Sequence, residues 1–443
     1  MSYLDNILFA IVLIIGFGYF ISNIKKIYRN INLGIDVDRK DNSKQRWKNM
    51  AMIALGQSKM VRRPIAGILH IIVYAGFIII NIELLEIIID GLFGTHRIFA
   101  FLGSFYNVLI ASFEILALLV IVSVTVFWLR RNVIRLKRFV NSDLNGFPKS
   151  DANYILYFET ILMFLFLFMN ASDSHLQNVS GGYSHFIKAG AFPISQFLAP
   201  LFDGVNSDAV AMMYELFWWM HIVGILAFMN YLYFSKHLHI LLAFPNTYFA
   251  NLKLLGEFNN LEAVTKEVKL MMDPNADPFA AAAEGAEVPA KFGASDIQDL
   301  NWVQLLNAYT CTECGRCTSV CPANTTGKKL SPRKIMMDTR DRMEEVGRNI
   351  DANKGVFVPD NKSLLNDYIT PEELWACTSC NACVEECPVS ISPLSIIMDM
   401  RRYLVMEQSA APAALNNMMT NVENNGAPWP YNQQDRLNWK NEL

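Results

Sequence analysis

Eight cysteines in two runs constrain this 443-residue chain most, because they are its only cysteines and share one spacing. Both runs read C-x2-C-x2-C-x3-C-P; the first holds Cys311, Cys314, Cys317 and Cys321, and the second holds Cys377, Cys380, Cys383 and Cys387. Thiolates are soft ligands that suit iron–sulfur clusters. Three cysteines at this spacing can surround one face of a [4Fe–4S] cubane, and the fourth ligates the other cluster in two-cluster ferredoxins.

We therefore predict two [4Fe–4S] clusters that exchange one ligand. The ligands are Cys311, Cys314, Cys317 and Cys387 for cluster 1, and Cys377, Cys380, Cys383 and Cys321 for cluster 2. A pair of zinc sites is the alternative, but zinc motifs use C-x2-C pairs and seldom add a third cysteine and a fourth before proline. Neither cluster has an open ligand position, so we expect a one-electron wire rather than a catalytic centre. Helical patterns at residues 333–346 and 371–375, between the runs, predict a helical ferredoxin domain.

Long apolar stretches before residue 245 raise the hydrophobic fraction to 52% and leave only 18% charged residues. Each approaches the roughly 20 apolar residues that a helix needs to cross a bilayer. The five predicted spans are residues 4–24, 64–89, 108–129, 154–170 and 212–234. The first lacks a preceding basic stretch and a small-residue cleavage site, so we expect a retained anchor rather than a signal peptide.

The loops between these spans predict the orientation in the membrane. Residues 25–63 carry eleven Lys and Arg and residues 130–151 carry six, whereas residues 90–107 and 171–211 carry one each. Basic loops face the cytoplasm. We therefore expect the N-terminus outside and the cysteine runs in the cytoplasm, at the inner (cytoplasmic) membrane.

The predicted fold is all-α: a five-helix transmembrane bundle followed by a cytoplasmic helical two-cluster ferredoxin domain. We expect a five-span domain of the cytochrome b kind at residues 1–245 and a connecting segment at 246–300, within which residues 276–295 are rich in Ala, Gly and Pro. The ferredoxin domain then occupies residues 301–410 and a polar tail residues 411–443.

Four histidines lie in or at the ends of the spans, where ionisable residues are functional candidates by default. In a redox bundle they usually bind haem b as axial ligands. If the last span stays helical beyond residue 234, His221 and His239 share one face, because eighteen residues make five turns, while His237 lies to one side. We predict one haem b near the cytoplasm, held by His70 and His239.

His221 lies deeper, and the outer half of the second span offers no histidine as its partner. It is a candidate for a second haem or for quinone contact, with a structural role as the alternative. We expect the remaining histidines, His96, His175 and His185, to be surface residues.

Acidic residues also collect in the outer half of the predicted bundle: Glu114, Glu83, Glu86 and Glu215. Carboxyl groups there are unfavourable unless they are paired or carry protons, so we predict a proton path to an outer quinone site. Solvation at the interface is the alternative for all but Glu114, which lies deeper. Glu159 lies toward the cytoplasmic end of the fourth span.

Residues 308–332 (AYTCTECGRCTSVCPANTTGKKLSP) and 373–405 resemble membrane-bound iron–sulfur oxidoreductases related to heterodisulfide reductase, as does the tail at 421–439. Residues 63–77 (RPIAGILHIIVYAGF) and 219–245 resemble the five-span cytochrome b subunit of respiratory nitrate reductase. The ligand pattern of that subunit falls on His70, His239 and His221, while its fourth histidine falls on Ile80. The resemblance thus supports the first haem and places the second in doubt.

The resemblance implies a respiratory electron-transfer subunit that connects quinone with cytoplasmic partners. Many relatives continue into cysteine-rich CCG repeats, so a separate CCG-type iron–sulfur subunit or a flavoprotein dehydrogenase is the expected partner. Electron-transfer flavoprotein, lactate-type and thiol–disulfide systems stay open, and we expect no nucleic acid. The alternatives are a non-catalytic membrane anchor and assembly platform, and a haem-free chain with structural histidines.

Overall fold

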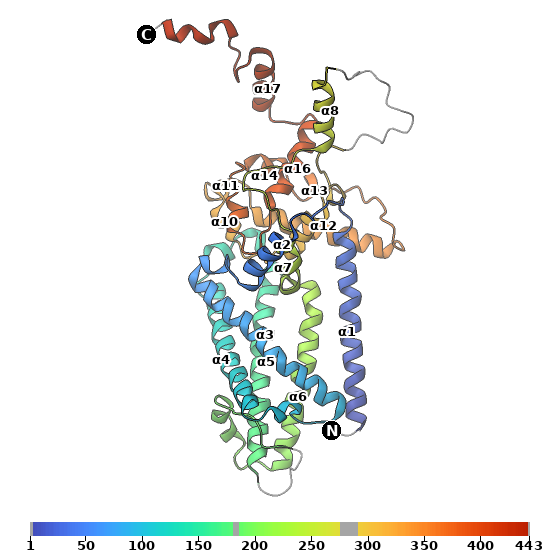
Figure 1. Cartoon of the computed structure of the whole chain (residues 1–443), viewed down its shortest axis with the longest axis vertical. Helices are drawn as coiled ribbons and strands as arrows, with labels where there is room; N and C mark the ends of the chain where they lie inside the picture. The colour runs from blue at the N-terminus through green and yellow to red at the C-terminus, as the bar shows by residue number, and fades with distance from the viewer. Residues whose placement is uncertain (1–2, 180–185, 275–290, 442–443) are drawn as a thin grey trace.

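The computed structural model describes residues 3–179, 186–274 and 291–441, and every regular element in these ranges is a helix. Figure 1 shows an elongated molecule with a bundle of long helices in its lower part, which α3 crosses obliquely, and shorter helices above them. The N-terminus lies at the end of the bundle that is remote from the shorter helices. The predicted all-α fold is confirmed.

Five helices are long and apolar enough to cross a membrane. They are α1 (Tyr3–Ile31), α3 (Pro64–Phe93), α4 (Ser104–Asn132), α5 (Phe147–Asn178) and α6 (Ser207–Tyr231). At a rise of about 1.5 Å per residue, each exceeds the roughly 30 Å of a hydrocarbon core. The five predicted spans are therefore confirmed, although α5, whose span was predicted to be the shortest, is the longest helix with 32 residues.

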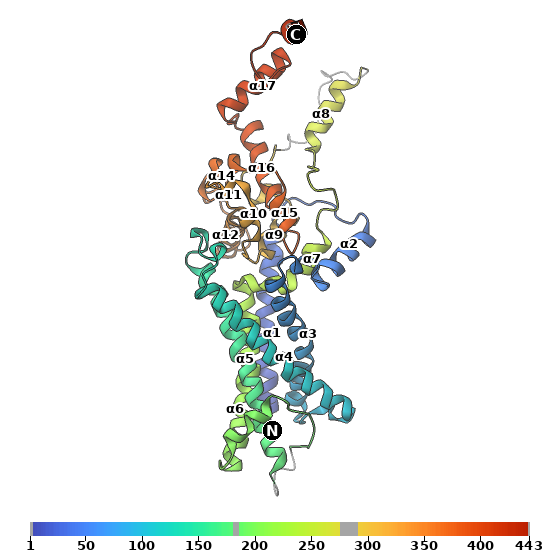
Figure 2. The same cartoon turned by 90° about the vertical axis from the view of Figure 1, so that its left-hand side faces the viewer.

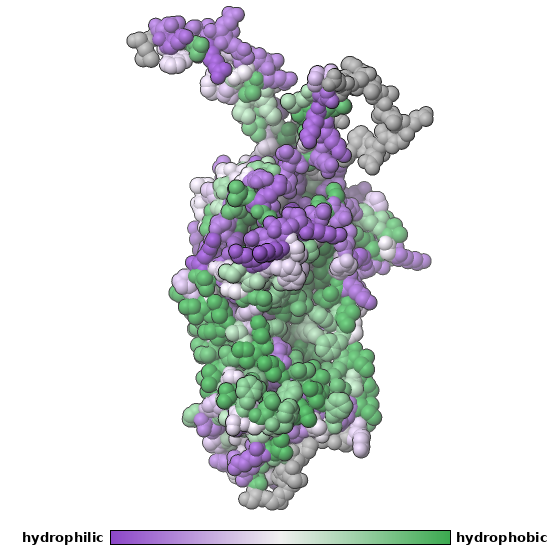
Figure 3. All heavy atoms as spheres, in the orientation of Figure 1, coloured by the Kyte–Doolittle hydropathy of each residue, from purple (hydrophilic) through white to green (hydrophobic). Residues whose placement is uncertain are grey.

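The outer face of the bundle is apolar. Figure 3 shows a broad hydrophobic belt around the long helices, with polar side chains gathered above it and at its lower end. Large side chains such as Ile14 and Met212 are more than 70% exposed on this face. An apolar surface of this extent is typical of contact with lipid, where helices satisfy their own backbone polar groups.

Small residues allow close approach between the helices of the bundle. A Cβ atom added to Gly76 of α3 would lie 2.7 Å from a methyl carbon of Val120 on α4. One added to Gly91 of α3 would lie 2.5 Å from the ring of Phe9 on α1. Membrane helices associate through such close packing, because lipid provides no hydrophobic driving force between them.

Short elements connect the long helices and lead from α6 toward the upper domain. They are α2 (Ser43–Met50), the π-helix η1 (Ala51–Leu55), α7 (His239–Tyr248) and the 3₁₀ turns η2 (Met60–Arg62), η3 (Ile98–Leu102), η4 (Lys137–Phe139), η5 (Ser142–Leu144), η6 (Ser195–Phe197), η7 (Ala199–Phe202), η8 (Leu232–Phe234) and η9 (Lys236–Leu238).

The upper part of the molecule is a helical domain around its own apolar core. Its elements are η10 (Ile297–Asp299), α9 (Trp302–Thr310), α10 (Arg316–Val320), α11 (Pro322–Thr325), α12 (Pro332–Ala352), α13 (Leu364–Asp367), α14 (Pro371–Ala376), α15 (Ala382–Glu386) and α16 (Pro393–Met406). The predicted helices at 333–346 and 371–375 are confirmed as α12 and α14. Fully buried side chains include Leu305, Ile335 and Ile396, and the same core continues into Ile27 and Ile31 of α1.

Buried polar contacts join this domain to the bundle. Arg333 of α12 is fully buried, and its Nε donates to Asp143 Oδ2 of η5 at 3.1 Å while Nη2 donates to Oδ1. On the other side, Asn30 of α1 donates to the hydroxyl of Tyr309 at 2.9 Å. A Cβ atom on Gly347 would lie 2.5 Å from the end of the Asn30 side chain, so a larger residue here would displace Asn30.

Three further helices extend away from the domain, as Figure 2 shows: α8 (Glu262–Met272), α17 (Ala413–Asn425) and the 3₁₀ helix η11 (Gln433–Asn441). Most of the predicted linker at 276–295 lies outside the described residues. The domain boundaries stay predictions, and the one at residue 245 falls inside α7.

Replacing Arg333 with methionine tests the docking of the domain. The change leaves Asp143 buried without its partner, which is expected to lower the free energy of unfolding by about 3 to 5 kcal/mol. Thermal unfolding of the detergent-solubilised protein measures this effect. The double variant R333M/D143N should recover part of the loss, and an unchanged melting temperature in R333M would contradict the role of this pair.

Candidate functional site

The two cysteine runs fold into the same backbone shape. In each run, the residue two positions after the first cysteine has a positive φ angle, 53° at Glu313 and 58° at Ser379. The residue four positions after the first cysteine also has a positive φ angle, 70° at Gly315 and 60° at Asn381. Few side chains adopt this conformation readily apart from Gly and Asn. Each loop then enters a five-residue helix, α10 or α15.

The eight thiols border two adjacent pockets with empty volumes of about 380 and 310 Å³. The first is lined by Cys311, Cys314, Cys317 and Cys387, and the second by Cys321, Cys377 and Cys380. Cys383 borders both pockets. The fourth cysteine of each run therefore reaches the pocket formed by the first three of the other run.

All eight cysteines are free thiols, which excludes a disulfide framework. Within the described ranges, no three His, Cys, Asp or Glu side chains gather closely enough to hold a single metal ion. The thiols instead border two pockets in two sets of four, the number of ligands that two [4Fe–4S] clusters need.

Burial disfavours the charged form of these thiols. It raises the pKa of Cys311 to about 12 and that of Cys387 to about 11. A bound metal centre must therefore supply the positive charge that stabilises the thiolates, and its binding releases protons.

Glu313, inside the first cysteine loop, links this pocket to the bundle. Its buried carboxylate forms ion pairs with Lys236 of η9 and, at 2.7 Å, with Arg340 of α12. Burial opposes its ionisation, but the two cations hold the pKa of Glu313 below its ordinary value. Arg316 strengthens the link, donating to the carbonyl oxygens of Lys59 and Met60 at 3.2 Å, just before α3.

His70 and His239 face each other at the end of the bundle nearest these pockets. Their ring centroids are 6.4 Å apart, and the rings are tilted by 41°. Two imidazoles on opposite sides of one iron, with bonds of about 2 Å, would have centroids about 6 Å apart. The ring of His239 is oriented by a 3.1 Å hydrogen bond between Nδ1 and the carbonyl of Lys236, which leaves Nε2 available as a ligand.

The helical continuation expected beyond residue 234 is wrong. α6 ends at Tyr231, and Ser235 is extended with φ −111° and ψ 145°. The five-turn relation between His221 and His239 therefore does not exist. His239 instead begins α7, after the turn η9 has redirected the chain toward α3.

His237 points toward the fourth span. Its Nε2 lies 3.6 Å from Oε1 of Glu159, and its ring centroid lies 5.4 Å from that of His239. The side chains of His237 and Glu159 are each 15% exposed.

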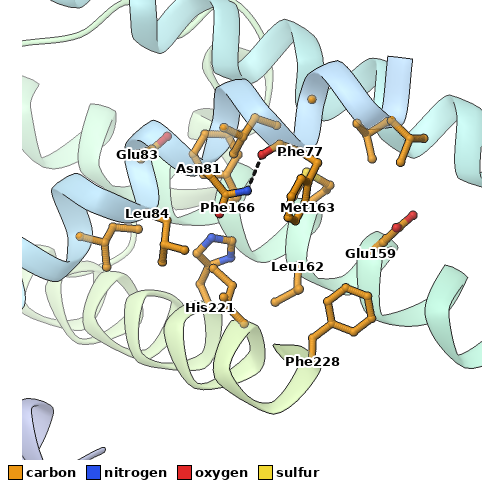
Figure 4. Close-up of a pocket in the computed structure, with 16 residues that line it drawn as sticks. Phe77, Asn81, Glu83, Leu84, Glu159, Leu162, Met163, Phe166, His221 and Phe228 are labelled. Atoms are coloured by element: carbon orange, nitrogen blue, oxygen red, sulfur yellow. Dashed lines mark hydrogen bonds between the residues drawn. The ribbon is translucent and has the colours of Figure 1, made fainter. Parts of the chain in front are cut away.

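His221 lines a cavity between α3, α4, α5 and α6 with an empty volume of about 750 Å³, including the space at its mouth. Figure 4 shows its ring pointing into the cavity, with Glu83 and Glu159 on either side. Among the described residues, neither Nδ1 of His221 nor Oε2 of Glu83 has a hydrogen-bond partner. Ile80 lines the same cavity.

The other acids of the outer half are not in this cavity. Glu86 accepts hydrogen bonds of 2.8 Å from the Phe99 amide and the Tyr106 hydroxyl. Glu114 accepts from the amides of Ile194 and Ser195, at 2.8 and 3.0 Å. Glu215 is exposed on α6. Of the four acids that the sequence grouped together, Glu83 lines the cavity and Glu86 and Glu114 bond to Tyr106 and Asn170 beside it, so only Glu215 lies apart.

Sequence reasoning missed a buried network around Arg97. Its guanidinium pairs with Asp173 and donates to Tyr106 and Asn170 at 3.0 Å each. His96, expected on the surface, has a side chain only 6% exposed and lies 3.4 Å from Asp173. The sequence does contain a signal for this network. Arg97 is the one arginine of its outer loop, and Asp90 and Asp173 lie near the ends of two spans.

Of the other two histidines expected on the surface, the structure describes only His175. His175 belongs to α5, its side chain is 18% exposed, and it lies 3.7 Å from Asp203. His185 lies outside the described residues.

Residues 310–391 match the family described as the 4Fe-4S dicluster domain. These residues contain all eight cysteines that border the two pockets. The chain therefore carries [4Fe–4S] clusters in a domain of this kind. No solved structure matches the chain.

Longer matches cover the membrane part as well. The chain is 29% identical over 470 aligned positions to the "Probable iron-sulfur-binding oxidoreductase FadF" of Bacillus subtilis, covering 99% of the chain and 61% of that protein. It is 27% identical to the "EtfAB:quinone oxidoreductase" of Syntrophomonas wolfei, covering 92% of the chain and 55% of that protein. The chain thus spans little more than half the length of these curated relatives.

A third relative, the "Probable membrane-anchored ferredoxin" of Chromohalobacter salexigens, is 34% identical over 35% of the chain and 25% of its own length. Together with the five apolar helices, this match marks the chain as a membrane protein. The chain is an iron–sulfur protein related to oxidoreductases of the FadF and heterodisulfide reductase kind. Its likeness to the cytochrome b subunit of nitrate reductase stays a prediction.

Proposed function

We propose that this chain passes electrons between the quinone pool and a redox partner in the cytoplasm, through haem b and two [4Fe–4S] clusters. The observation that carries the proposal is the sequence of sites along the molecule. The cavity at His221 lies within the bundle, the pair His70 and His239 lies nearer the domain, and the cysteine pockets follow. Cys380, on the second pocket, is exposed.

The proposed ligands of cluster 1 are Cys311, Cys314, Cys317 and Cys387, and those of cluster 2 are Cys377, Cys380, Cys383 and Cys321. The two pockets support this assignment, since each is lined by the proposed set. The clusters supply one-electron carriers when they are bound. Cluster 1 then lies next to the bundle, because its loop is tied to Lys236 and to the residues before α3.

We assign the axial positions of one haem b to His70 and His239. The distance between their rings and the fixed orientation of His239 support this assignment. Both histidines belong to segments that also contact the first cysteine loop: α3 follows Lys59 and Met60, and α7 follows Lys236. Electrons thus have a short route between the membrane and the domain.

The cavity at His221 is proposed as the quinone site rather than a second haem site. Ile80 lines this cavity, at the position where the ligand pattern of the nitrate reductase cytochrome b subunit has its fourth histidine. Oxidation of a quinol releases two electrons and two protons. Nδ1 of His221 and the carboxyl of Glu83 are the groups without partners that can exchange those protons. Glu86 and Glu114 would continue the path outward, while exposed Glu215 meets solvent directly.

The partner is proposed to be a flavoprotein dehydrogenase or a CCG-type iron–sulfur subunit. The name of the Syntrophomonas relative joins EtfAB to quinone, and more distant relatives are named as heterodisulfide reductase subunits. Exposed Cys380 favours electron exchange on that face of the domain. The excess of basic residues in residues 25–63 and 130–151 supports a cytoplasmic position for the domain at the inner membrane.

Alanine variants of single cysteines test the crossed ligand sets. C387A and C314A should lose the same cluster, and C321A and C380A the other one, with about half the iron left in each. Electron paramagnetic resonance of the reduced proteins should give one residual spectrum for the first pair and a different one for the second. If C387A resembled C380A instead, the ligands would not cross.

Haem content tests the histidine pair. H70A and H239A should each lose the b-type bands from the reduced-minus-oxidised spectrum, because one imidazole holds haem poorly. H175A, at the opposite end of the bundle, serves as the control and should keep the bands. Haem retained in both of the first two variants would contradict the assignment, and wild-type protein without b-type bands would establish the haem-free alternative.

Quinol-dependent haem reduction tests the function itself. Purified wild-type protein should be reduced by a quinol, and E83Q and H221A should react about a hundredfold more slowly, the effect expected for lost proton transfer. D203N is the control, because Asp203 is an exposed acid at the outer end of the bundle. If no quinol reduced the wild-type haem, the chain would be the non-catalytic anchor instead.

A further inference from the structure

A hollow lined by basic residues lies at the end of the bundle nearest the iron–sulfur domain. It has about 920 Å³ of empty space, including the part open to solvent. Its walls come from the start of α3, the end of α4 and the turn η4. Its basic residues, here called the arginine pocket, are Arg62, Arg63, Arg130, Lys137 and Arg138.

Only two of these five cations have acidic partners in the described part of the chain. Arg62 pairs with Glu385 at 2.6 Å and Arg63 pairs with Glu386 at 2.7 Å. The other three, Arg130, Lys137 and Arg138, form no ion pair within the described ranges. The pocket therefore carries an excess of about three positive charges, counted at neutral pH.

Arg138 is the most constrained of the three. Among the described residues its buried Nε has no hydrogen-bond partner, and its guanidinium lies over the ring of Phe139 at 4.8 Å. Arg63 and Arg130 line the same pocket, so like charges are crowded around Arg138. A bound anion would relieve this crowding of like charges.

The start of α3 adds a further attraction for an anion. The helix begins at Pro64, and no side chain caps it at Arg63. The first turn of a helix presents free backbone N–H groups and the positive end of its dipole. At Ile65 and Ala66 this turn lines the pocket, so backbone donors and guanidinium groups converge on the same space.

Exposed apolar side chains lie on the wall of the pocket or close in sequence to the residues that line it. Ile65, Ile68, Val133 and Ile134 are each more than half exposed. Ile65 lines the pocket itself, and Figure 3 shows the apolar belt of the long helices meeting the polar side chains of the domain end. A ligand here would meet cations at one end and hydrocarbon at the other.

We propose that the arginine pocket binds the headgroup of an anionic phospholipid whose acyl chains lie along the outer faces of α3 and α4. The shared chemistry is a phosphate anion, and the apolar border selects lipid over free phosphate. Basic pockets between membrane helices on the cytoplasmic side bind such headgroups in other proteins. This site is independent of the quinone and haem proposals.

The lipid would also support the docking of the iron–sulfur domain. Arg62 and Arg63 join the pocket to Glu385 and Glu386, which directly precede Cys387. A headgroup that neutralises the remaining cations lowers the repulsion on these two arginines and so favours their ion pairs with α15.

Native mass spectrometry of the full-length protein, titrated with phosphatidylglycerol in detergent, tests the proposal. The wild type should bind one phosphatidylglycerol more tightly than any other, and more tightly than phosphatidylcholine. The triple variant R130Q/K137Q/R138Q should bind it about a hundredfold more weakly, because each basic residue contributes about fivefold. Iron content and melting temperature should stay close to wild type, since the three side chains have no acidic partners in the described structure.

A second triple variant, K25Q/K26Q/K44Q, removes the same charge from the same end of the molecule but outside the pocket. Its affinity should stay within about twofold of the wild type, because these three lysines do not line the pocket. Two results would overturn the proposal: unchanged phosphatidylglycerol affinity in R130Q/K137Q/R138Q, or equal displacement of the lipid by inorganic phosphate at the same concentration. The latter would assign the pocket to a free anion.

Discussion

The arrangement of the sites depends on buried ion pairs between the helical bundle and the iron–sulfur domain. Glu313 is held between Lys236 of the bundle and Arg340 of the domain, and Arg333 reaches back to Asp143. Such pairs are sensitive to loss of one partner, because a single buried charge is strongly unfavourable. They also determine geometry, since Lys236 precedes His239 and Glu313 lies between two cysteines of the first loop. The contact that docks the domain therefore also positions His239 and the first cysteine loop.

Polar groups inside the bundle fall into two classes. Arg97, Asp173, Glu86 and Glu114 satisfy one another or the backbone, so they stabilise the outer end of the helices. Glu83 and His221 instead border a cavity with unsatisfied atoms. Because an unpaired polar group in a membrane is unfavourable, the second class is the one expected to meet a ligand.

Local features of the sequence predicted most of the fold. Hydrophobic length alone identified the five spans, because a helix in lipid must satisfy its own backbone hydrogen bonds. The cysteine spacing predicted the iron–sulfur domain, and the helical pattern predicted α12 and α14. The backbone of the loops also agrees with the sequence at two positions, because Gly315 and Asn381 are residue types that tolerate positive φ.

Long-range pairing was beyond the same reasoning. No proline or glycine marks the break in the helix at Ser235. On either side of Ser235, the Tyr231 hydroxyl and the Lys236 amide donate hydrogen bonds to Asp151, which stabilise the extended conformation. His96 lies in a loop by sequence but is buried by its contact with Asp173, a residue 77 positions later. Such contacts are set by tertiary packing, which neither hydropathy nor spacing encodes.

Rapid-freeze electron paramagnetic resonance after mixing with quinol tests whether electrons reach the clusters through the haem. The iron–sulfur clusters of the wild type should become reduced, whereas those of H70A, with both clusters intact, should stay oxidised on the same timescale. Reduction of the clusters at the wild-type rate in H70A would contradict a route through the haem.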